Sequence, residues 1–223
     1  MAKILLVEDE EALREVVSFN VQNAGHEIVG TDNANDALML LEDFLPDLIL
    51  LDIMLPGLKG DQFLTLIRAN QKFVQIPVII ISAKSSEGDI VRILEAGADD
   101  YLTKPFSMKV LLAKIMVVLK RSRTDEGGAP ITYAGISIDE AKHKAFVAEL
   151  EIVLTNKEFQ LLLLFLKHPR RVFTRNQLLT TIWGYDADVY TRTVDSHIST
   201  LRKKLGKAGQ IIRSIPKIGY KAE

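Results

Sequence analysis

Three short runs of almost uninterrupted apolar residues constrain the fold of this chain more than any other feature. They span residues 4–7, 48–53 and 77–81, and none alternates apolar and polar residues as a strand with one solvated face would. The segments between them carry apolar residues at helical spacing, and Val17 and Val21, for example, share one helical face. Strands buried on both faces that alternate with helices predict a parallel sheet in a doubly wound α/β domain.

The same pattern continues through the first half of the chain and gives five β/α units. Strands are expected near residues 2–7, 27–31, 48–53, 77–82 and 99–103, and helices near 10–24, 33–44, 60–70, 86–96 and 107–121. Gly25 is the expected stop of the first helix. In such a domain, ligands bind outside the carboxyl ends of the strands.

The pattern changes after residue 121. Residues 122–130 contain no periodic apolar residues and are predicted to form a flexible linker. They separate an N-terminal domain, 1–121, from a C-terminal domain, 131–223. Short alternating segments near 131–138, 144–148 and 150–154 predict a small antiparallel sheet at the start of the second domain.

Three helices and a hairpin are expected in the rest of the C-terminal domain. Capping boxes begin the first two helices, with Thr155 and Glu158 in one and Thr174 and Gln177 in the other. The third helix is expected to bury Val194, Ile198, Leu201 and Leu205. Residues 211–220 predict a hairpin in which Gly219 is free to adopt an unusual backbone angle. This combination predicts a winged helix-turn-helix, an α+β fold.

Composition and charge narrow the class of protein. The chain has no cysteine, which excludes disulfide frameworks and thiol nucleophiles, and its first apolar run meets acidic residues too soon for a signal peptide. We therefore expect a cytoplasmic protein without a membrane partner. Residues 1–123 carry 13 basic and 18 acidic residues, or −5, whereas residues 124–223 carry 15 and 11, or +4. A basic second half is typical of nucleic-acid binding, although a solvated basic face would look the same.

Five polar residues lie at or just after the ends of the predicted strands, at one edge of the sheet: Glu8, Asp9, Asp52, Ser82 and Lys104. Each alone is commonplace, because single acidic residues at strand ends usually cap the next helix. Together they predict a pocket. Clustered carboxylates repel one another unless a cation lies between them, and an all-oxygen set of ligands suits Mg²⁺.

Four motifs around this pocket resemble those of the receiver domain of two-component response regulators, specifically the OmpR/PhoB family. They are residues 7–10, 51–57, 81–83 and 97–106, and four further motifs at 154–159, 182–184, 192–198 and 219–220 resemble the DNA-binding domain of the same family. The resemblance covers the whole chain. It implies a doubly wound, five-stranded parallel-sheet receiver domain joined to an α+β winged helix-turn-helix domain.

The resemblance also implies roles for the pocket residues. Asp52 is expected to be the phosphorylated nucleophile. The expected Mg²⁺ ligands are Asp9, Asp52, the carbonyl of Met54 and, through water, Glu8. Lys104, with an expected cis peptide bond to Pro105, pairs with a phosphoryl oxygen. Ser82 is expected to bond to the phosphate, which draws in the following loop and lets the Tyr101 ring turn inward.

A dimer interface is implied on the fourth helix, fifth strand and fifth helix. Two ion pairs of the family are matched, by Asp100 with Lys114 and by Asp99 with Arg121. A third is replaced by the apolar residues Ile90 and Val110, which we interpret either as favouring self-pairing or as a local repacking.

DNA contacts are implied on the third helix and in the hairpin. Phosphate contacts are expected from Arg192, His197, Arg202 and Lys203, and base contacts from Ser199 and Thr200, where relatives often carry arginine. The hairpin departs from the family pattern by having Pro216 and Lys217 in place of the usual arginine and glycine, so that Lys217 would supply the charge.

These features predict a phosphorylation-activated transcription factor of a bacterial two-component system, and not an enzyme. Its expected partners are a sensor histidine kinase, a second copy of the chain, direct-repeat promoter DNA with half-sites about one helical turn apart and, as a further candidate, RNA polymerase. Two alternatives stay open. One is a regulator that binds DNA without phosphorylation, and the other is an aspartyl-phosphate phosphohydrolase, for which Met54 stands where a general-acid aspartate is needed.

Overall fold

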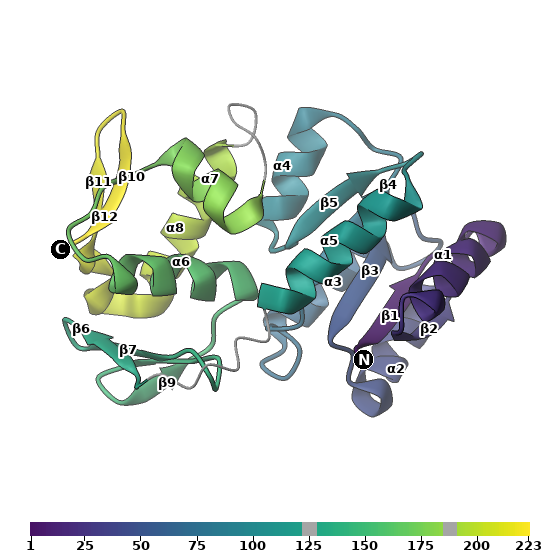
Figure 1. Cartoon of the computed structure of the whole chain (residues 1–223), viewed down its shortest axis with the longest axis horizontal. Coiled ribbons are helices and arrows are strands. Elements are labelled where there is room, and N and C mark those ends of the chain that lie inside the picture. Colours follow the sequence, from purple (N-terminus) through teal and green to yellow (C-terminus); the bar gives the residue numbers. More distant parts are fainter. Residues whose placement is uncertain (122–128, 185–190) are drawn as a thin grey trace. The chain divides into compact units, whose positions relative to one another are not determined.

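The computed structural model describes residues 1–121, 129–184 and 191–223, apart from the side chains of residues 120, 121, 191 and 192. The chain divides into two compact units, residues 1–121 and 122–223 (Figure 1). The described helices include none that is both long and apolar enough to cross a membrane.

The N-terminal unit is a doubly wound α/β domain, as predicted. Its elements in chain order are β1 (Lys3–Val7), α1 (Glu11–Asn23), β2 (Glu27–Thr31), α2 (Ala34–Phe44), β3 (Leu48–Asp52), α3 (Gly60–Ala69), β4 (Val78–Ser82), α4 (Glu87–Glu95), β5 (Asp100–Thr103) and α5 (Met108–Arg121). The five strands are parallel in the order β2-β1-β3-β4-β5. Gly25 ends α1 with a positive φ of 84°.

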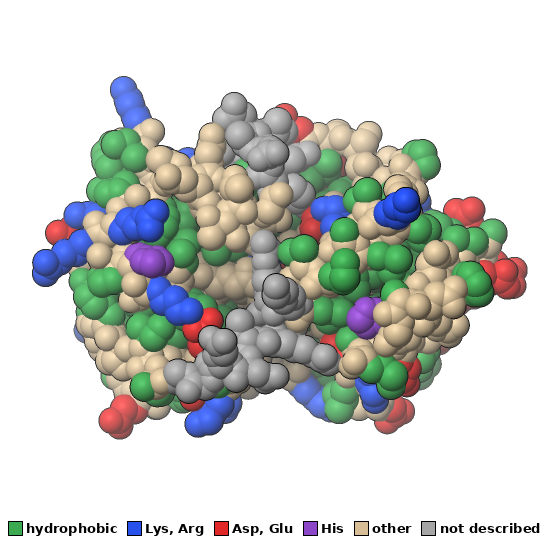
Figure 2. Space-filling model, in the orientation of Figure 1, with side chains coloured by type: hydrophobic (Ala, Val, Ile, Leu, Met, Phe, Trp, Pro, Cys, Tyr) green, Lys and Arg blue, Asp and Glu red, His purple; other side chains and the backbone are tan. Residues whose placement is uncertain are grey.

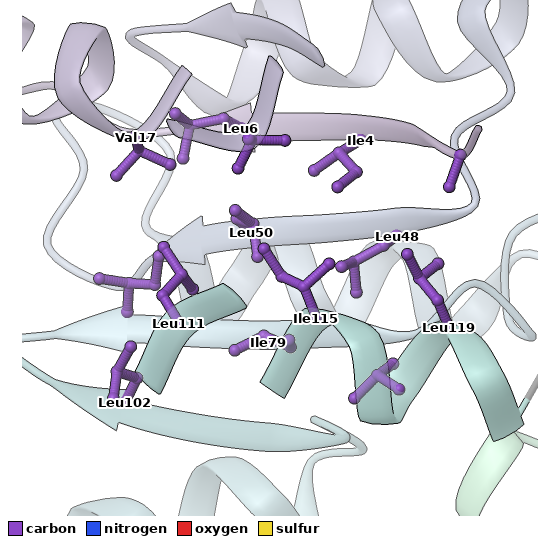
Figure 3. Packing of buried hydrophobic residues seen from close by; sticks show 14 residues of the cluster. Ile4, Leu6, Val17, Leu48, Leu50, Ile79, Leu102, Leu111, Ile115 and Leu119 are labelled. Atoms are coloured by element: carbon purple, nitrogen blue, oxygen red, sulfur yellow. The ribbon is translucent and has the colours of Figure 1, made fainter. Parts of the chain in front are cut away.

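Both faces of the sheet are buried, which explains the continuous apolar runs. Alternate side chains of β1, β3 and β4 pack against α1 and α5 (Figure 3). The contacts made by α5 come from Leu111, Ile115 and Leu119, which Figure 3 shows facing the strands. The intervening strand residues, such as Leu5 and Ile49, have no exposed surface either, so the opposite face is covered as well.

The C-terminal unit is a winged-helix domain, also as predicted. It contains β6 (Ile131–Tyr133), β7 (Ile136–Asp139), β8 (Lys144–Val147), β9 (Leu150–Ile152), α6 (Asn156–Lys167), β10 (Phe173–Thr174), α7 (Arg175–Trp183), α8 (Thr191–Leu205), a 3₁₀ helix η1 (Gly206–Ile211), β11 (Ile212–Ile215) and β12 (Gly219–Ala222). The first four strands form an antiparallel sheet, and β10, β12 and β11 form a second one. Both capping boxes are present.

The structure corrects three local predictions in this unit. The single segment expected at 131–138 is a hairpin, because Ala134 and Gly135 both adopt positive φ and turn the chain. The short strand β10, which pairs with β12, was not predicted. Gly219 has no positive φ. A Cβ there would lie 2.0 Å from the carbonyl oxygen of Phe173, whereas the unusual angle falls on Lys217, with a φ of 62°.

A second close approach, in the N-terminal unit, fixes the backbone at the end of β3. Gly60 begins α3, and its amide donates a hydrogen bond to the carbonyl of Ile53 at 3.2 Å. A Cβ at Gly60 would lie 2.1 Å from the carbonyl oxygen of Asp52, which is far inside van der Waals contact. Only glycine therefore lets α3 start directly against the residue that ends β3.

Replacing Gly60 by alanine should lower the free energy of unfolding by about 1–3 kcal/mol, because the backbone at Asp52 must shift to make room. Gly88→Ala is the matched control, since Gly88 lies in α4 with open space around it. That variant should gain about 0.5–1 kcal/mol, because alanine loses less backbone entropy in a helix. Urea unfolding followed by circular dichroism measures both, and equal midpoints for the two variants would contradict the close approach.

Candidate functional site

Three carboxylates meet at the carboxyl edge of the parallel sheet. Glu8 and Asp9 follow β1, and Asp52 ends β3, beside β1 in the sheet. Each offers one oxygen, and these three oxygens lie within 4.8 Å of one another. Glu8 and Asp52 are buried, at 1% and 4% exposure, whereas Asp9 is exposed. The pocket predicted from the strand ends is therefore present.

Lys104 joins the two buried carboxylates. It follows β5, and its Nζ lies 2.8 Å from Oε1 of Glu8 and 2.6 Å from Oδ2 of Asp52. Its peptide bond to Pro105 is cis, as expected. Burial alone would lower the pKa of the Lys104 ammonium, but its hydrogen bonds to Asp52 and Glu8 outweigh burial and raise that pKa. The lysine is thus held in its charged form between two carboxylates that would otherwise repel each other.

Main-chain contacts hold the acidic residues in place. The guanidinium of Arg14, from α1, donates to the carbonyl of Glu8 at 2.7 Å and to that of Asp9 at 3.3 Å. The amide of Met54 donates to Oδ1 of Asp52 at 2.7 Å, so that each oxygen of this carboxylate accepts one hydrogen bond. The motifs gave no signal for Arg14, whose partners are carbonyls that every residue type carries.

The residues present fit a divalent cation. Oε2 of Glu8 is buried and has no hydrogen-bond partner among the described residues, although a buried carboxylate oxygen normally has one. Burial raises the pKa of the Glu8 carboxyl, and the hydrogen bond from Lys104 offsets only part of that shift. An oxygen-only cluster with an unsatisfied buried acceptor is compatible with Mg²⁺, whose preferred ligands are carboxylate, carbonyl and water oxygens.

Ser82 and Tyr101 lie next to this pocket on β4 and β5. Ser82 is fully buried, and its hydroxyl accepts a hydrogen bond from the amide of Lys84 at 3.3 Å. The ring of Tyr101 already has the inward position that was expected to follow phosphorylation: 6% of the residue is exposed, and its hydroxyl donates to the carbonyl of Lys84 at 2.8 Å. Both side chains therefore contact the main chain of the same residue in the β4–α4 loop.

The face predicted to dimerise differs from expectation in two respects. Asp99 is 1% exposed, and its Oδ2 accepts hydrogen bonds from Arg68 at 3.1 Å and from the amide of Val78 at 2.9 Å. Ile90 is 7% exposed and packs inside the domain, so it is not the surface residue that its proposed role required. The side chain of Arg121 lies outside the described residues.

Of the remaining residues of that face, Val110 is exposed and Lys114 is partly exposed, whereas Asp100 is buried, at 6% exposure. Lys114 Nζ contacts both oxygens of Asp100, at 2.8 and 2.9 Å, within the same chain. Val110 is 45% exposed. An ion pair between two copies would therefore replace a pair that already exists within each copy.

The outward face of α8 carries Ser199, Thr200 and Lys203, all exposed, as predicted. His197 was wrongly placed on that face. It is 5% exposed, its Nδ1 lies 2.8 Å from the carbonyl of Thr193, and its ring packs edge-on against Trp183 at 5.0 Å. The side chain of residue 192 lies outside the described set.

Arg202 is also used within the domain instead of projecting from it. Its guanidinium donates to the carbonyl of Ile212 through Nε at 3.0 Å and Nη2 at 2.6 Å, and to the hydroxyl of Ser214 at 2.9 Å. It thereby ties α8 to β11, the first strand of the wing. Lys217, in the turn between β11 and β12, is exposed.

A second group of contacts that the sequence did not reveal fixes α8 from the other side. Asp195 Oδ1 accepts from Arg175 Nε at 2.7 Å and from the Tyr220 hydroxyl at 2.6 Å. The Tyr220 ring lies near the guanidinium groups of both Arg175 and Arg202, at 5.1 and 5.5 Å. Burial raises the pKa of the Tyr220 hydroxyl, and the bond to Asp195 raises it further. This cluster joins α7, α8 and β12.

Comparison with known proteins agrees with this geometry. Residues 4–116 match the family model described as response regulator receiver domain, and residues 149–222 match the one described as transcriptional regulatory protein, C terminal. The phosphate regulon transcriptional regulatory protein PhoB of Escherichia coli is 40% identical over 221 residues, covering 98% of this chain and 96% of its own. The alkaline phosphatase synthesis transcriptional regulatory protein PhoP of Bacillus subtilis is 38% identical over 233 residues, covering 99% and 96%.

Two solved structures are similar over the full length. A RitR mutant gives a TM-score of 0.77 at 27% identity, and the response regulator DrrB, a Thermotoga maritima OmpR/PhoB homolog, gives 0.52 at 29% identity. Both matches cover 100% of this chain and 99% of the other. With a receiver domain, a C-terminal regulatory domain and full-length relatives, this chain belongs to the OmpR/PhoB family of response regulators, the phosphorylation-activated, DNA-binding transcriptional regulators.

Proposed function

We propose that Asp52 accepts a phosphoryl group from the phosphohistidine of a sensor histidine kinase. The observation that carries this proposal is the contact of Asp52 with Lys104 in a buried acidic pocket. In the transfer, a carboxylate oxygen of Asp52 forms the new P–O bond while the P–N bond to histidine breaks, and the released imidazole takes up a proton. The Lys104 ammonium offsets charge on the transferring group.

The proposed metal ligands are Asp9, Asp52, the main-chain carbonyl of Met54 and, through water, Glu8. The unsatisfied Oε2 of Glu8 supports this set. When bound, Mg²⁺ supplies positive charge against the phosphoryl oxygens. Arg14 contributes by fixing the backbone that carries Glu8 and Asp9.

The proposed docking surface for the kinase is a groove beside Lys104. It has a volume of about 600 Å³ and is lined by Glu10, Ala12, Leu13, Val16, Ala83, Lys104, Pro105, Phe106 and Met108. Hydrophobic side chains gather over the region of α1 and α5 in Figure 2, and those of α1 include Val16 and Phe19, which are 49% and 64% exposed. A partner that docks on this apolar surface brings its phosphohistidine to the edge of the sheet where Asp52 lies.

Ser82 and Tyr101 form the proposed switch. Both side chains bond to the main chain of Lys84. A movement of Ser82 would therefore move the β4–α4 loop and with it the carbonyl that binds the Tyr101 hydroxyl. A phosphoryl group on Asp52 would offer Ser82 a charged acceptor for its hydroxyl proton. The loop would then follow Ser82, and Tyr101 holds its inward position through the Lys84 carbonyl.

Dimerisation is proposed through α4, β5 and α5, followed by binding to direct-repeat DNA. The exposed apolar Val110 supports a contact that depends little on ion pairs, because Asp100 and Lys114 are already paired within each chain. Lys203 of α8 and Lys217 of the wing are exposed cations that can reach DNA phosphates. RNA polymerase stays a candidate partner of the bound dimer.

The protein's own chemistry is then a self-phosphorylation and not catalysis of turnover. A phosphohydrolase of this type needs a general acid two residues after its nucleophile, and the exposed thioether of Met54 cannot donate a proton.

Asp52→Asn should abolish both phosphorylation and its effect on DNA binding, because an amide cannot form the acyl phosphate. Wild type and variant are incubated with acetyl phosphate and Mg²⁺ and compared by intact mass and by affinity for DNA selected from a random pool. Asp32→Asn, an exposed acid outside the pocket, is the control and should behave as wild type. An Asp52→Asn protein that still gains affinity on phosphodonor treatment would favour a regulator that does not depend on this phosphate.

Val110→Glu should weaken the dimer of the beryllofluoride-activated protein about ten-fold, the effect expected when a half-exposed apolar side chain in an interface is replaced by a solvated charge. Sedimentation velocity at several salt concentrations measures it. Met39→Glu, which changes an apolar residue that is 66% exposed on α2, is the control and should leave the dimer unchanged. A Val110→Glu protein that dimerises as well as wild type would argue that this residue lies outside the interface.

Lys217→Ala should weaken DNA binding and reduce the slope of log K against log salt by about 0.9, the value expected when the protein neutralises one DNA phosphate fewer. Lys142→Ala removes a lysine whose side chain is 74% exposed in the β7–β8 turn and should not change the slope. Fluorescence anisotropy between low and moderate salt gives both slopes. Identical slopes for wild type and Lys217→Ala would exclude binding of the wing lysine to the DNA backbone.

A further inference from the structure

The described outward face of α8 carries few long side chains that can form hydrogen bonds to base edges. Its exposed residues are Ser199, Thr200 and Lys203, and Ser196 beside them is partly exposed. Lysine is a compact point charge suited to phosphate, whereas bidentate guanine readout favours arginine. Base recognition by this part of the helix must therefore come from short side chains that approach the base edges closely.

Thr200 differs from the two serines in that it carries a methyl group, and its hydroxyl is already engaged. The hydroxyl donates a hydrogen bond to the carbonyl of Ser196, one helical turn earlier, at 3.2 Å. The Cβ of threonine bears only a hydroxyl, a methyl and a hydrogen. With the hydroxyl bonded to the backbone of the helix, the methyl is the group that remains to face a ligand.

The major groove presents one apolar group, the C5 methyl of thymine, and threonine methyl groups are among its known partners. We propose that Thr200 makes α8 select thymine at one position of each half-site, through contact between its own methyl and the thymine methyl. This inference rests on the DNA-binding role of the domain and adds the base preference and the residue responsible for it.

The position of Thr200 is fixed well enough for such a short contact. Asp195, five residues before it, is tied to α7 and β12 through Arg175 and Tyr220. Arg202, two residues after it, is tied to β11 through Ile212 and Ser214. Anchors on both sides limit movement of α8 relative to the rest of the domain. A contact between two methyl groups needs such a fixed position, because its attraction is mostly lost when the groups move about an ångström apart.

The test combines one methyl removed from the protein with one removed from the DNA. Wild type, Thr200→Ser and Thr200→Val are measured against a site selected from a random pool and against copies in which single dT positions are replaced by dU, which lacks only the methyl. For wild type, dU at one position should weaken binding about four-fold, the effect expected for burying one methyl group. Thr200→Val keeps the methyl and should show the same four-fold penalty.

Thr200→Ser keeps the hydroxyl but lacks the methyl, so it should bind dT and dU equally at that position. If instead the serine variant keeps the dU penalty, or the valine variant loses it, the methyl of Thr200 is not the reader and the proposal is wrong. A site selected without thymine at any position sensitive to Thr200 would also overturn it. Failure of all three proteins to bind any DNA would instead refute the DNA-binding role itself, so the two failures are distinguishable.

Ser199→Ala serves as the matched control, because it changes the neighbouring exposed residue of α8 without touching Thr200. It should keep the four-fold dT preference at the position assigned to Thr200. Thermal unfolding of all variants checks that α8 is intact, since the Thr200→Val change removes the hydrogen bond to Ser196. If folded Thr200→Val protein and wild type select different bases at that position, the hydroxyl is the reader and the methyl is not.

Discussion

The contact of the Lys104 ammonium with Glu8 and Asp52 is the interaction that holds the acidic pocket of the receiver domain together. Two carboxylates buried side by side repel each other when both are ionised. A charged lysine between them offsets this repulsion and holds the carboxylate of Asp52, the proposed nucleophile, in place. The same ammonium bonds to Oδ2 of Asp52, so the proposed phosphorylation of Asp52 would redistribute bonds that already hold the pocket together.

The sequence predicted this pocket because its members follow parallel strands. Strands buried on both faces appear as continuous apolar runs, and the residues that end them meet at one edge whatever their separation in the chain. Glu8 and Lys104, 96 positions apart, could therefore be placed in one pocket without a structure, although their direct contact was not predicted. The exclusion of any side chain at Gly60 could not be predicted from the sequence, because the close approach of α3 to Asp52 depends on the conformation of the intervening loop.

The wrong predictions have a different physical origin. The family resemblance implied that His197 faces DNA, yet α8 buries a wider stripe than its apolar residues mark, and the Trp183 ring packs against the imidazole. Asp99 was expected to pair with a second copy, but Arg68, 31 residues away on α3, reaches it inside the domain. Helical spacing identifies which side chains share a face. It does not identify which distant side chain reaches a given carboxylate first.

Three arginines show a common use of charge in this chain: each bonds to backbone carbonyls of its own domain. Arg14 holds the loop of Glu8 and Asp9, Arg68 donates to the carbonyls of residues 74, 76 and 97, and Arg202 joins α8 to the wing. A guanidinium used in this way orders a functional loop or helix, and in α8 it is no longer available to DNA phosphates. The described face of α8 is consequently low in charge, so this face offers few phosphate contacts, and its specificity should depend on short side chains held in fixed positions.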